Sequence, residues 1–167
     1  AKHMSYDDDG NLCAIENRDM SGAVSRTVQM LYSPRGLMTW RESDPGTEET
    51  FSYDARGALV SAEDGSGDWT FAYDAMGRPE AQTQHVTALG IDATTSFTYD
   101  DNGQLTSMTY PEVEGFDAGP GTLTRTYAAT TNRVTDIELD TGAVALGITH
   151  DGLGRPLGFE MGNGTVH

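Results

Sequence analysis

The chain has 167 residues and a formal net charge of −16, from 26 acidic and 10 basic side chains. This acidity argues against nucleic acid or an anionic membrane surface as a partner, because both require a basic protein face. Cys13 is the only cysteine, so no disulfide forms within the chain, and no apolar stretch approaches the roughly 18 residues of a membrane-spanning helix.

The first four residues, Ala1-Lys2-His3-Met4, resemble the remainder of a cleaved expression tag. We expect residues 5–167 to form one domain, a single array of about seven repeats. The repeat pattern starts and stops in mid-unit, which predicts a fragment of a larger protein.

A short phrase recurs along the chain: Tyr-Asp, two variable residues, Gly, one variable residue and Leu. Clear copies begin at Tyr6, Tyr53, Tyr73 and Tyr99, and weaker copies begin at Tyr32, Tyr127 and His150. The intervals between successive starts, taken over all of these copies, are 26, 21, 20, 26, 28 and 23 residues. A period of this size indicates one small structural unit that is used many times. The motif positions are, in chain order, Tyr6, Asp7, Gly10 and Leu12; Tyr32 and Gly36; Tyr53, Asp54, Gly57 and Leu59; Tyr73, Asp74 and Gly77; Tyr99, Asp100, Gly103 and Leu105; Tyr127; and His150, Asp151 and Gly154.

Each repeat predicts a β-hairpin. An Asp at the first position of a turn accepts hydrogen bonds from the backbone N–H groups ahead of it, and Gly at the fourth position tolerates positive φ. Before the turn, large rings fall at every second position, as in Trp69, Phe71 and Tyr73, which places them on one face of a strand. The stretch after the glycine, such as 59–62, is the return strand.

The linkers between hairpins are turn-rich and vary in length, whereas the Asp-to-Gly turn has a fixed length. The linkers are Asp44-Pro45-Gly46, Asp64 to Asp68, Ala88 to Asp92, Glu114 to Gly121 and Asp140-Thr141-Gly142. Since a lone hairpin is marginally stable, consecutive hairpins should pair edge to edge. We therefore predict an all-β fold, an antiparallel meander that twist makes curl into a spiralling sheet.

The phrases Phe97 to Leu105, Phe71 to Pro79 and Thr149 to Leu157 resemble the YD-repeat family, also called Rhs repeats. The resemblance covers about residues 5–166. It implies a spiralling β-sheet that can close into a hollow shell. In bacterial Rhs proteins and toxin complexes the shell encloses a toxic C-terminal domain, and in teneurins a related shell is part of a cell-adhesion ectodomain.

The resemblance therefore implies a non-catalytic segment of shell wall, from a bacterial parent protein that is secreted or at the cell surface. Its partners would be the rest of the shell and the enclosed C-terminal domain. We expect no cofactor and no metal site, and the repeated Tyr and Asp are interpreted as structural. Unpaired strand edges also predict an edge-to-edge homodimer at high concentration.

Two alternatives remain open at the level of the sequence. Exposed aromatic rings beside Asp and Asn can bind sugars, and Trp40 and Trp69 are the candidate contacts for a carbohydrate-binding or adhesion module. The acidic run Asp7-Asp8-Asp9 offers oxygen ligands for calcium but lacks the alternating spacing of an EF-hand loop. No grouping of residues indicates catalysis.

Overall fold

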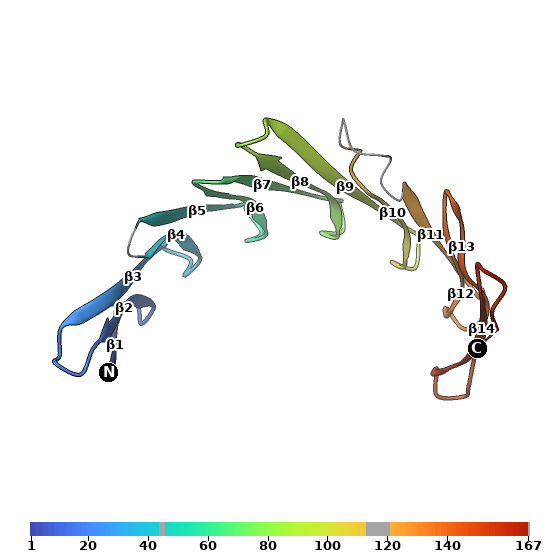
Figure 1. Ribbon diagram of the computed structural model, residues 1–167, viewed down its shortest axis with the longest axis horizontal. Helices are drawn as coiled ribbons and strands as arrows, with labels where there is room; N and C mark the ends of the chain where they lie inside the picture. Colours follow the sequence, from blue (N-terminus) through green and yellow to red (C-terminus); the bar gives the residue numbers. More distant parts are fainter. Residues whose placement is uncertain (44–45, 113–120, 167) are drawn as a thin grey trace. The chain divides into compact units, whose positions relative to one another are not determined.

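The computed structural model describes residues 1–43, 46–112 and 121–166, and these contain β-strands and turns but no helix. The strands are β1 (Lys2–Tyr6), β2 (Leu12–Arg18), β3 (Val24–Tyr32), β4 (Met38–Ser43), β5 (Thr47–Tyr53), β6 (Leu59–Asp64), β7 (Gly67–Tyr73), β8 (Pro79–Val86), β9 (Ile91–Tyr99), β10 (Leu105–Thr109), β11 (Thr122–Tyr127), β12 (Val134–Leu139), β13 (Gly142–His150) and β14 (Pro156–Met161) (Figure 1). None of these residues belongs to a helix long and apolar enough to cross a membrane.

The strands follow one another in the sheet in the same order as in the sequence, from β1 to β14. Neighbouring strands within each hairpin run antiparallel, for example β5 with β6 and β13 with β14. The predicted all-β antiparallel meander is thus confirmed. The expected turn residues Asp44 and Pro45, and residues 114–120 of the linker that begins at Glu114, lie outside the described residues.

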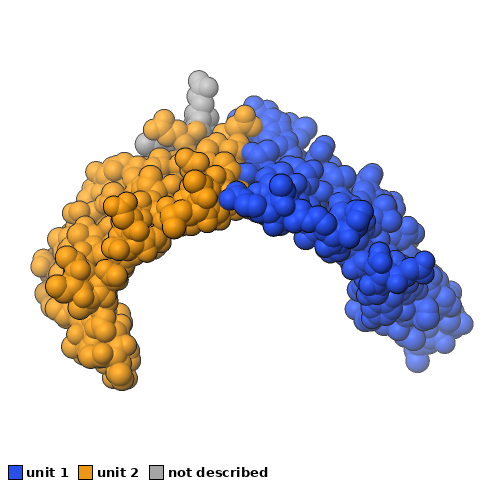
Figure 2. Space-filling view, turned by 180° about the vertical axis from the view of Figure 1, so that it is seen from behind, with its two compact units in different colours: residues 1–71, 84–91 blue, residues 72–83, 92–167 orange. Residues whose placement is uncertain are grey.

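The chain divides into two compact units, shown in different colours in Figure 2. The first contains residues 1–71 and 84–91, and the second contains residues 72–83 and 92–167. Residues 2–4, expected to be tag, form part of β1 in the first unit and pair with β2.

Burial alternates along strands that lead into the Tyr position, such as β5 and β9, as the spacing of large rings predicts, whereas return strands such as β4 are half-buried throughout. In β5 the side chains of Phe51 and Tyr53 are half-buried, while Thr50 and Ser52 are exposed. Among the described residues only Met30 and Ala145 are buried, at 7% and 8% exposure. In the described part of each unit few side chains are packed away from solvent, so stability depends on pairing between strands and on contacts between neighbouring repeats.

A register shift accompanies most of the turns that follow the repeated Tyr. In the first unit it falls between Ser5 and Tyr6, between Leu31 and Tyr32, and between Ser52 and Tyr53. Such a bulge adds one residue to one strand of the pair and increases the local twist. The repeated phrase therefore sets the twist of each hairpin as well as the position of its turn.

Candidate functional site

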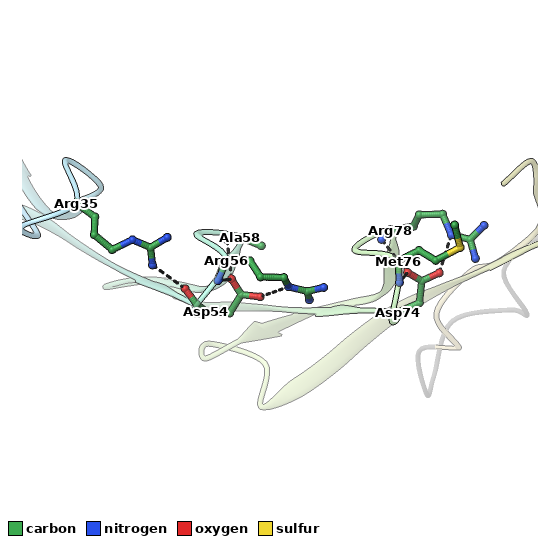
Figure 3. Close-up of polar contacts among 7 residues, drawn as sticks. All are labelled: Arg35, Asp54, Arg56, Ala58, Asp74, Met76 and Arg78. Carbon is green, nitrogen blue, oxygen red and sulfur yellow. Dashed lines mark hydrogen bonds and ion pairs between the residues drawn. The ribbon is translucent and has the colours of Figure 1, made fainter.

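The most regular polar feature of the molecule is the Asp turn, well seen at Asp54 (Figure 3). One carboxylate oxygen of Asp54 accepts hydrogen bonds from the backbone N–H groups of Arg56 at 2.9 Å and Ala58 at 2.8 Å. The backbone N–H of Asp54 donates to the carbonyl of Ala58 at 2.9 Å, which closes the turn. Gly57 has a φ of 90°, a conformation that favours glycine.

The same arrangement recurs at the other complete copies of the phrase. The turn carboxylates at Asp7, Asp74, Asp100 and Asp151 each accept two backbone N–H groups, from residues two and four positions ahead. Where Ser33 replaces Asp, its hydroxyl oxygen accepts the same two donors at the longer distances of 3.4 and 3.3 Å. In the degenerate copy after Tyr127, Asn132 takes positive φ, at 55°.

These hydrogen bonds favour the charged carboxylate. The backbone N–H of Ala58 is the main cause that lowers the pKa of Asp54 below its ordinary value of 3.8. The N–H groups of Arg78 and Arg155 likewise lower the pKa values of Asp74 and Asp151. At Asp7 the side-chain amide of Asn11 is the largest cause of the lowered pKa.

The repeated Tyr joins one repeat to the repeat before it. The hydroxyl of Tyr32 donates to the carbonyl of Leu12 at 3.0 Å, and that of Tyr53 donates to the carbonyl of Met38 at 2.8 Å. In the second unit the hydroxyl of Tyr127 donates to the carbonyl of Leu105, also at 2.8 Å. In each case the acceptor is the first residue of the preceding return strand.

Arginine side chains join the turns in the opposite direction, from one repeat to the next. Arg35 donates to the carbonyl of Asp54 at 3.3 Å, the contact drawn as a dashed line in Figure 3. In the second unit Arg78 donates to the carbonyl of Asp100 at 3.4 Å. It also lies over the ring of Tyr99, with the guanidinium carbon 4.5 Å from the ring centre, which is a cation–π geometry.

Two further contacts of this kind lie in the second unit. Arg133 donates to the carbonyl of Asp151 at 2.6 Å, and Gln104 donates to the carbonyl of Asn132 at 2.7 Å. The inter-turn contacts thus use Arg or Gln, both long enough to span neighbouring hairpins and both rich in donors.

The turn glycine also leaves room for the side chain that arrives from the preceding repeat. A Cβ atom at Gly57 would lie 3.2 Å from a terminal nitrogen of Arg35, and one at Gly154 would lie 3.3 Å from a terminal nitrogen of Arg133. The glycine therefore serves two purposes, positive φ within its own turn and space for the neighbouring turn.

Sequence reasoning placed the Tyr, Asp and Gly positions but missed the inter-turn side chains. For Arg78, Gln104 and Arg133 the available signal was a long polar residue directly after the turn Gly or Asn, whereas Arg35 lies before Gly36 and does not follow this pattern. His150, at the end of β13, occupies the Tyr position of the last repeat but has no hydroxyl to donate.

The two tryptophans proposed for sugar contact lie on opposite faces of the first unit. Trp40 is paired with Thr50, and its indole N–H donates to a carboxylate oxygen of Glu48 at 2.6 Å. Phe51, the residue after Thr50, is paired with Ala62, which is paired in turn with Trp69. Because directly paired residues share a face and adjacent residues do not, Trp40 and Trp69 do not contribute to one site.

Trp69 borders a cleft of about 240 Å³ in the first unit. Ala62 is paired with both Phe51 and Trp69 and lies between them, and the lining continues with Glu49, Gly67 and Gln84. A Cβ atom at Gly67 would lie 2.0 Å from the carbonyl oxygen of His85, so glycine is required at this point. Within the described ranges, no group of three or more His, Cys, Asp or Glu side chains is arranged to hold a metal ion.

Residues 53–92 match the family model of the RHS repeat, which confirms the resemblance found in the sequence. No curated protein matches the chain. Among solved structures, the crystal structure of TcdB2-TccC3-Cdc42 has a TM-score of 0.66 at 15% identity, over 99% of this chain and 10% of that one. The crystal structure of TcdB2-TccC3 without its hypervariable C-terminal region has a TM-score of 0.66 at 13% identity, over 99% and 12%.

The Tc holotoxin pore of Photorhabdus luminescens gives a TM-score of 0.52 at 14% identity, over 99% of this chain and 12% of that one. At these identities the likeness concerns the fold. The chain has the fold of one segment of these much longer chains, and spans about a tenth of their length.

Replacing Arg78 with Ala should lower the free energy of unfolding by about 1–2 kcal/mol, because it removes the inter-turn hydrogen bond and the cation–π contact. Arg56→Ala is the matched control, since the Arg56 side chain forms an ion pair with Asp54 of its own turn at 3.1 Å. That exposed pair should contribute less than about 0.5 kcal/mol. Urea denaturation measures both values, and equal losses would contradict the role given to the inter-turn contact.

The lowered pKa values of Asp54, Asp74 and Asp151 predict a loss of stability in acid. A carboxyl whose folded-state pKa is lowered stabilises the fold above its ordinary value of 3.8 and loses that effect as the pH falls towards the folded value. The variant with all three changed to Asn keeps the acceptor oxygens but does not titrate. The gap in melting temperature between the wild type and this variant should narrow below about pH 4. A gap that stays constant down to about pH 2 would contradict the prediction.

Proposed function

We propose that this chain, which carries RHS repeats, is a non-catalytic segment of the wall of a protein shell. The observation that supports this most directly is the double set of contacts between neighbouring repeats. The Tyr hydroxyls reach back to the preceding return strand, and the Arg side chains reach forward to the next turn. In these contacts a side chain of one repeat donates a hydrogen bond to a backbone carbonyl of a neighbouring repeat. The repeats can therefore extend a sheet through their own groups, without a bound molecule.

The rest of the wall would come from other repeats of a longer protein. The solved structures similar to this chain are about ten times its length, which supports a parent protein in which this segment is a small part. In such a parent we propose that the shell encloses a C-terminal toxic domain and that the protein is secreted or displayed at the cell surface of a bacterium. The similarity to the Tc holotoxin pore and to TcdB2-TccC3 supports this choice over an adhesion ectodomain.

The proposal is tested on the complete product of the gene that encodes this segment. Electron cryomicroscopy should show a closed, hollow β-shell with this segment in its wall, and limited proteolysis should leave the C-terminal domain intact. Arg78→Ala combined with Arg133→Ala should make that domain more accessible to protease, whereas Arg56→Ala should not. An open sheet, or a C-terminal domain that is cleaved as fast as the isolated domain, would contradict the proposal.

A second candidate function is sugar binding at the Trp69 cleft. The observation in its favour is a cleft lined by the aromatic rings of Trp69 and Phe51 together with the polar side chains of Glu49 and Gln84. A pyranose ring stacks on an aromatic face, and its hydroxyl groups donate hydrogen bonds to a carboxylate and accept them from a side-chain amide. If the cleft binds sugar, the protein should bind glycans on an array, and Trp69→Ala should abolish that binding. Trp40→Ala, on the opposite face, should leave it unchanged. An array on which the protein binds no glycan would exclude this function.

A further inference from the structure

The Trp69 cleft has an aromatic wall with one open face. In β7, Gly67, Trp69 and Phe71 share a face of the sheet because they stand two positions apart. The ring of Phe71 stacks against that of Trp69, with ring centres 6.4 Å apart and planes inclined by 13°. On the other side of Trp69 along the strand stands Gly67, which has no side chain to cover the indole. One face of the indole is therefore left open towards the cleft, which Gly67 also lines.

The cleft is hollow because the residue between its two aromatic rings is small. Ala62 is directly paired with Phe51 on one side and with Trp69 on the other. The volume is about 240 Å³. It exceeds the roughly 150 Å³ of a cavity that accommodates benzene and lies below the roughly 300–1,000 Å³ of sites for drug-sized ligands. The cleft therefore suits a single small head group.

The lining of the cleft is acidic and contains neither Lys nor Arg. Its carboxylates belong to Glu49, Glu63 and Asp64. Glu49 and Asp64 stand directly opposite each other in β5 and β6, and like charges at such positions destabilise a sheet. Arg41, paired with Glu49 from β4, donates to both carboxylate oxygens of Glu49. In the described part of the chain no basic side chain forms an ion pair with Asp64 or Glu63.

Asp64 is held in its charged form at the rim of the cleft. One of its carboxylate oxygens accepts the backbone N–H and the hydroxyl of Ser66 at 2.7 and 2.6 Å, and the N–H of Gly67 at 3.2 Å. The Ser66 hydroxyl is the main cause that lowers the pKa of Asp64 below its ordinary value of 3.8. All three contacts use the same oxygen, which leaves the second oxygen for a ligand.

We propose that this cleft binds a small organic cation of the alkylammonium class, such as a quaternary ammonium. The cation lies over the open face of Trp69, because the negative face of an aromatic ring attracts a cation. The carboxylates of Asp64 and Glu63 supply the opposite charge that the cleft itself lacks. The chain shows the same attraction between its own groups, where Arg78 lies over the ring of Tyr99.

The charge of the cleft distinguishes between ligands that an aromatic wall alone does not. A neutral sugar gains from the rings but leaves the carboxylates without a cation, and a ligand that carries its own phosphate is repelled by them. The observations therefore favour a free organic cation over a neutral sugar or a phosphate-bearing head group. All of the lining residues belong to the first unit, and the inference does not depend on the role of the segment in a shell wall.

The test uses the two indole N–H signals in the NMR spectrum of the nitrogen-labelled chain, which has only two tryptophans. Choline should shift the Trp69 signal until it saturates and should leave the signal of Trp40, on the opposite face, unchanged. The dissociation constant should lie in the millimolar range, because so small a ligand makes few contacts. Dimethylbutanol, the neutral analogue of choline in which carbon replaces nitrogen, should bind about three- to thirtyfold more weakly. Phosphocholine should also bind more weakly than choline.

Two variants separate charge from shape. Asp64→Asn keeps the acceptor oxygen of the turn but removes the charge, so it should weaken the binding of choline and not that of dimethylbutanol. Glu48→Gln is the matched control, because it removes an equal charge on the face that carries Trp40. Ala62→Leu fills the space between the rings and should abolish choline binding while the protein keeps every aromatic side chain and its melting temperature.

Equal binding of choline and dimethylbutanol would overturn the inference, and so would equal effects of Asp64→Asn and Glu48→Gln. If glucose shifts the Trp69 signal and choline does not, the cleft is a site for neutral sugar and the inference is wrong. No shift with any of these ligands at tens of millimolar overturns both uses of the cleft. None of these results changes the proposal of a shell wall, which depends on the contacts between repeats.

Discussion

The structure depends on one interaction: a turn carboxylate that accepts two backbone N–H groups while a glycine three positions later takes positive φ. At Asp54 this arrangement closes a hairpin within five residues. It fixes where each strand pair reverses and where the register shift beside the Tyr occurs. Variation in repeat length is then confined to the opposite hairpin ends, where a change in loop length has a small energetic cost.

The turn itself does not require tyrosine. Asp19, in the turn between β2 and β3, forms the same arrangement although Arg18 and not Tyr precedes it. Its carboxylate accepts the N–H groups of Ser21 and Ala23 at 2.8 and 3.0 Å, and Gly22 has a φ of 85°. Tyr therefore has a separate role. Its ring covers the sheet face and its hydroxyl reaches the preceding repeat, so the phrase combines a local turn with a lateral connection.

The lateral connections matter because, in the described part of the chain, very few buried side chains pack neighbouring repeats against each other. With two buried side chains among the described residues, packing cannot supply the stability that a globular core provides. Each repeat instead interacts with its neighbours through strand pairing, a Tyr hydroxyl and a long polar side chain. Stability of this kind is distributed along the array instead of being concentrated in one core.

The sequence by itself determined the hairpins, the turn chemistry and the order of the strands, because each turn is contiguous in the chain with the two strands that it joins and carries the same repeated phrase. Only the tertiary structure decided which side chains cross between repeats, since Arg35 meets Asp54 through lateral spacing and register. It also decided that Trp40 and Trp69 face opposite ways. Each register shift beside a Tyr changes which residues share a face, so periodicity within one strand does not carry over to the next.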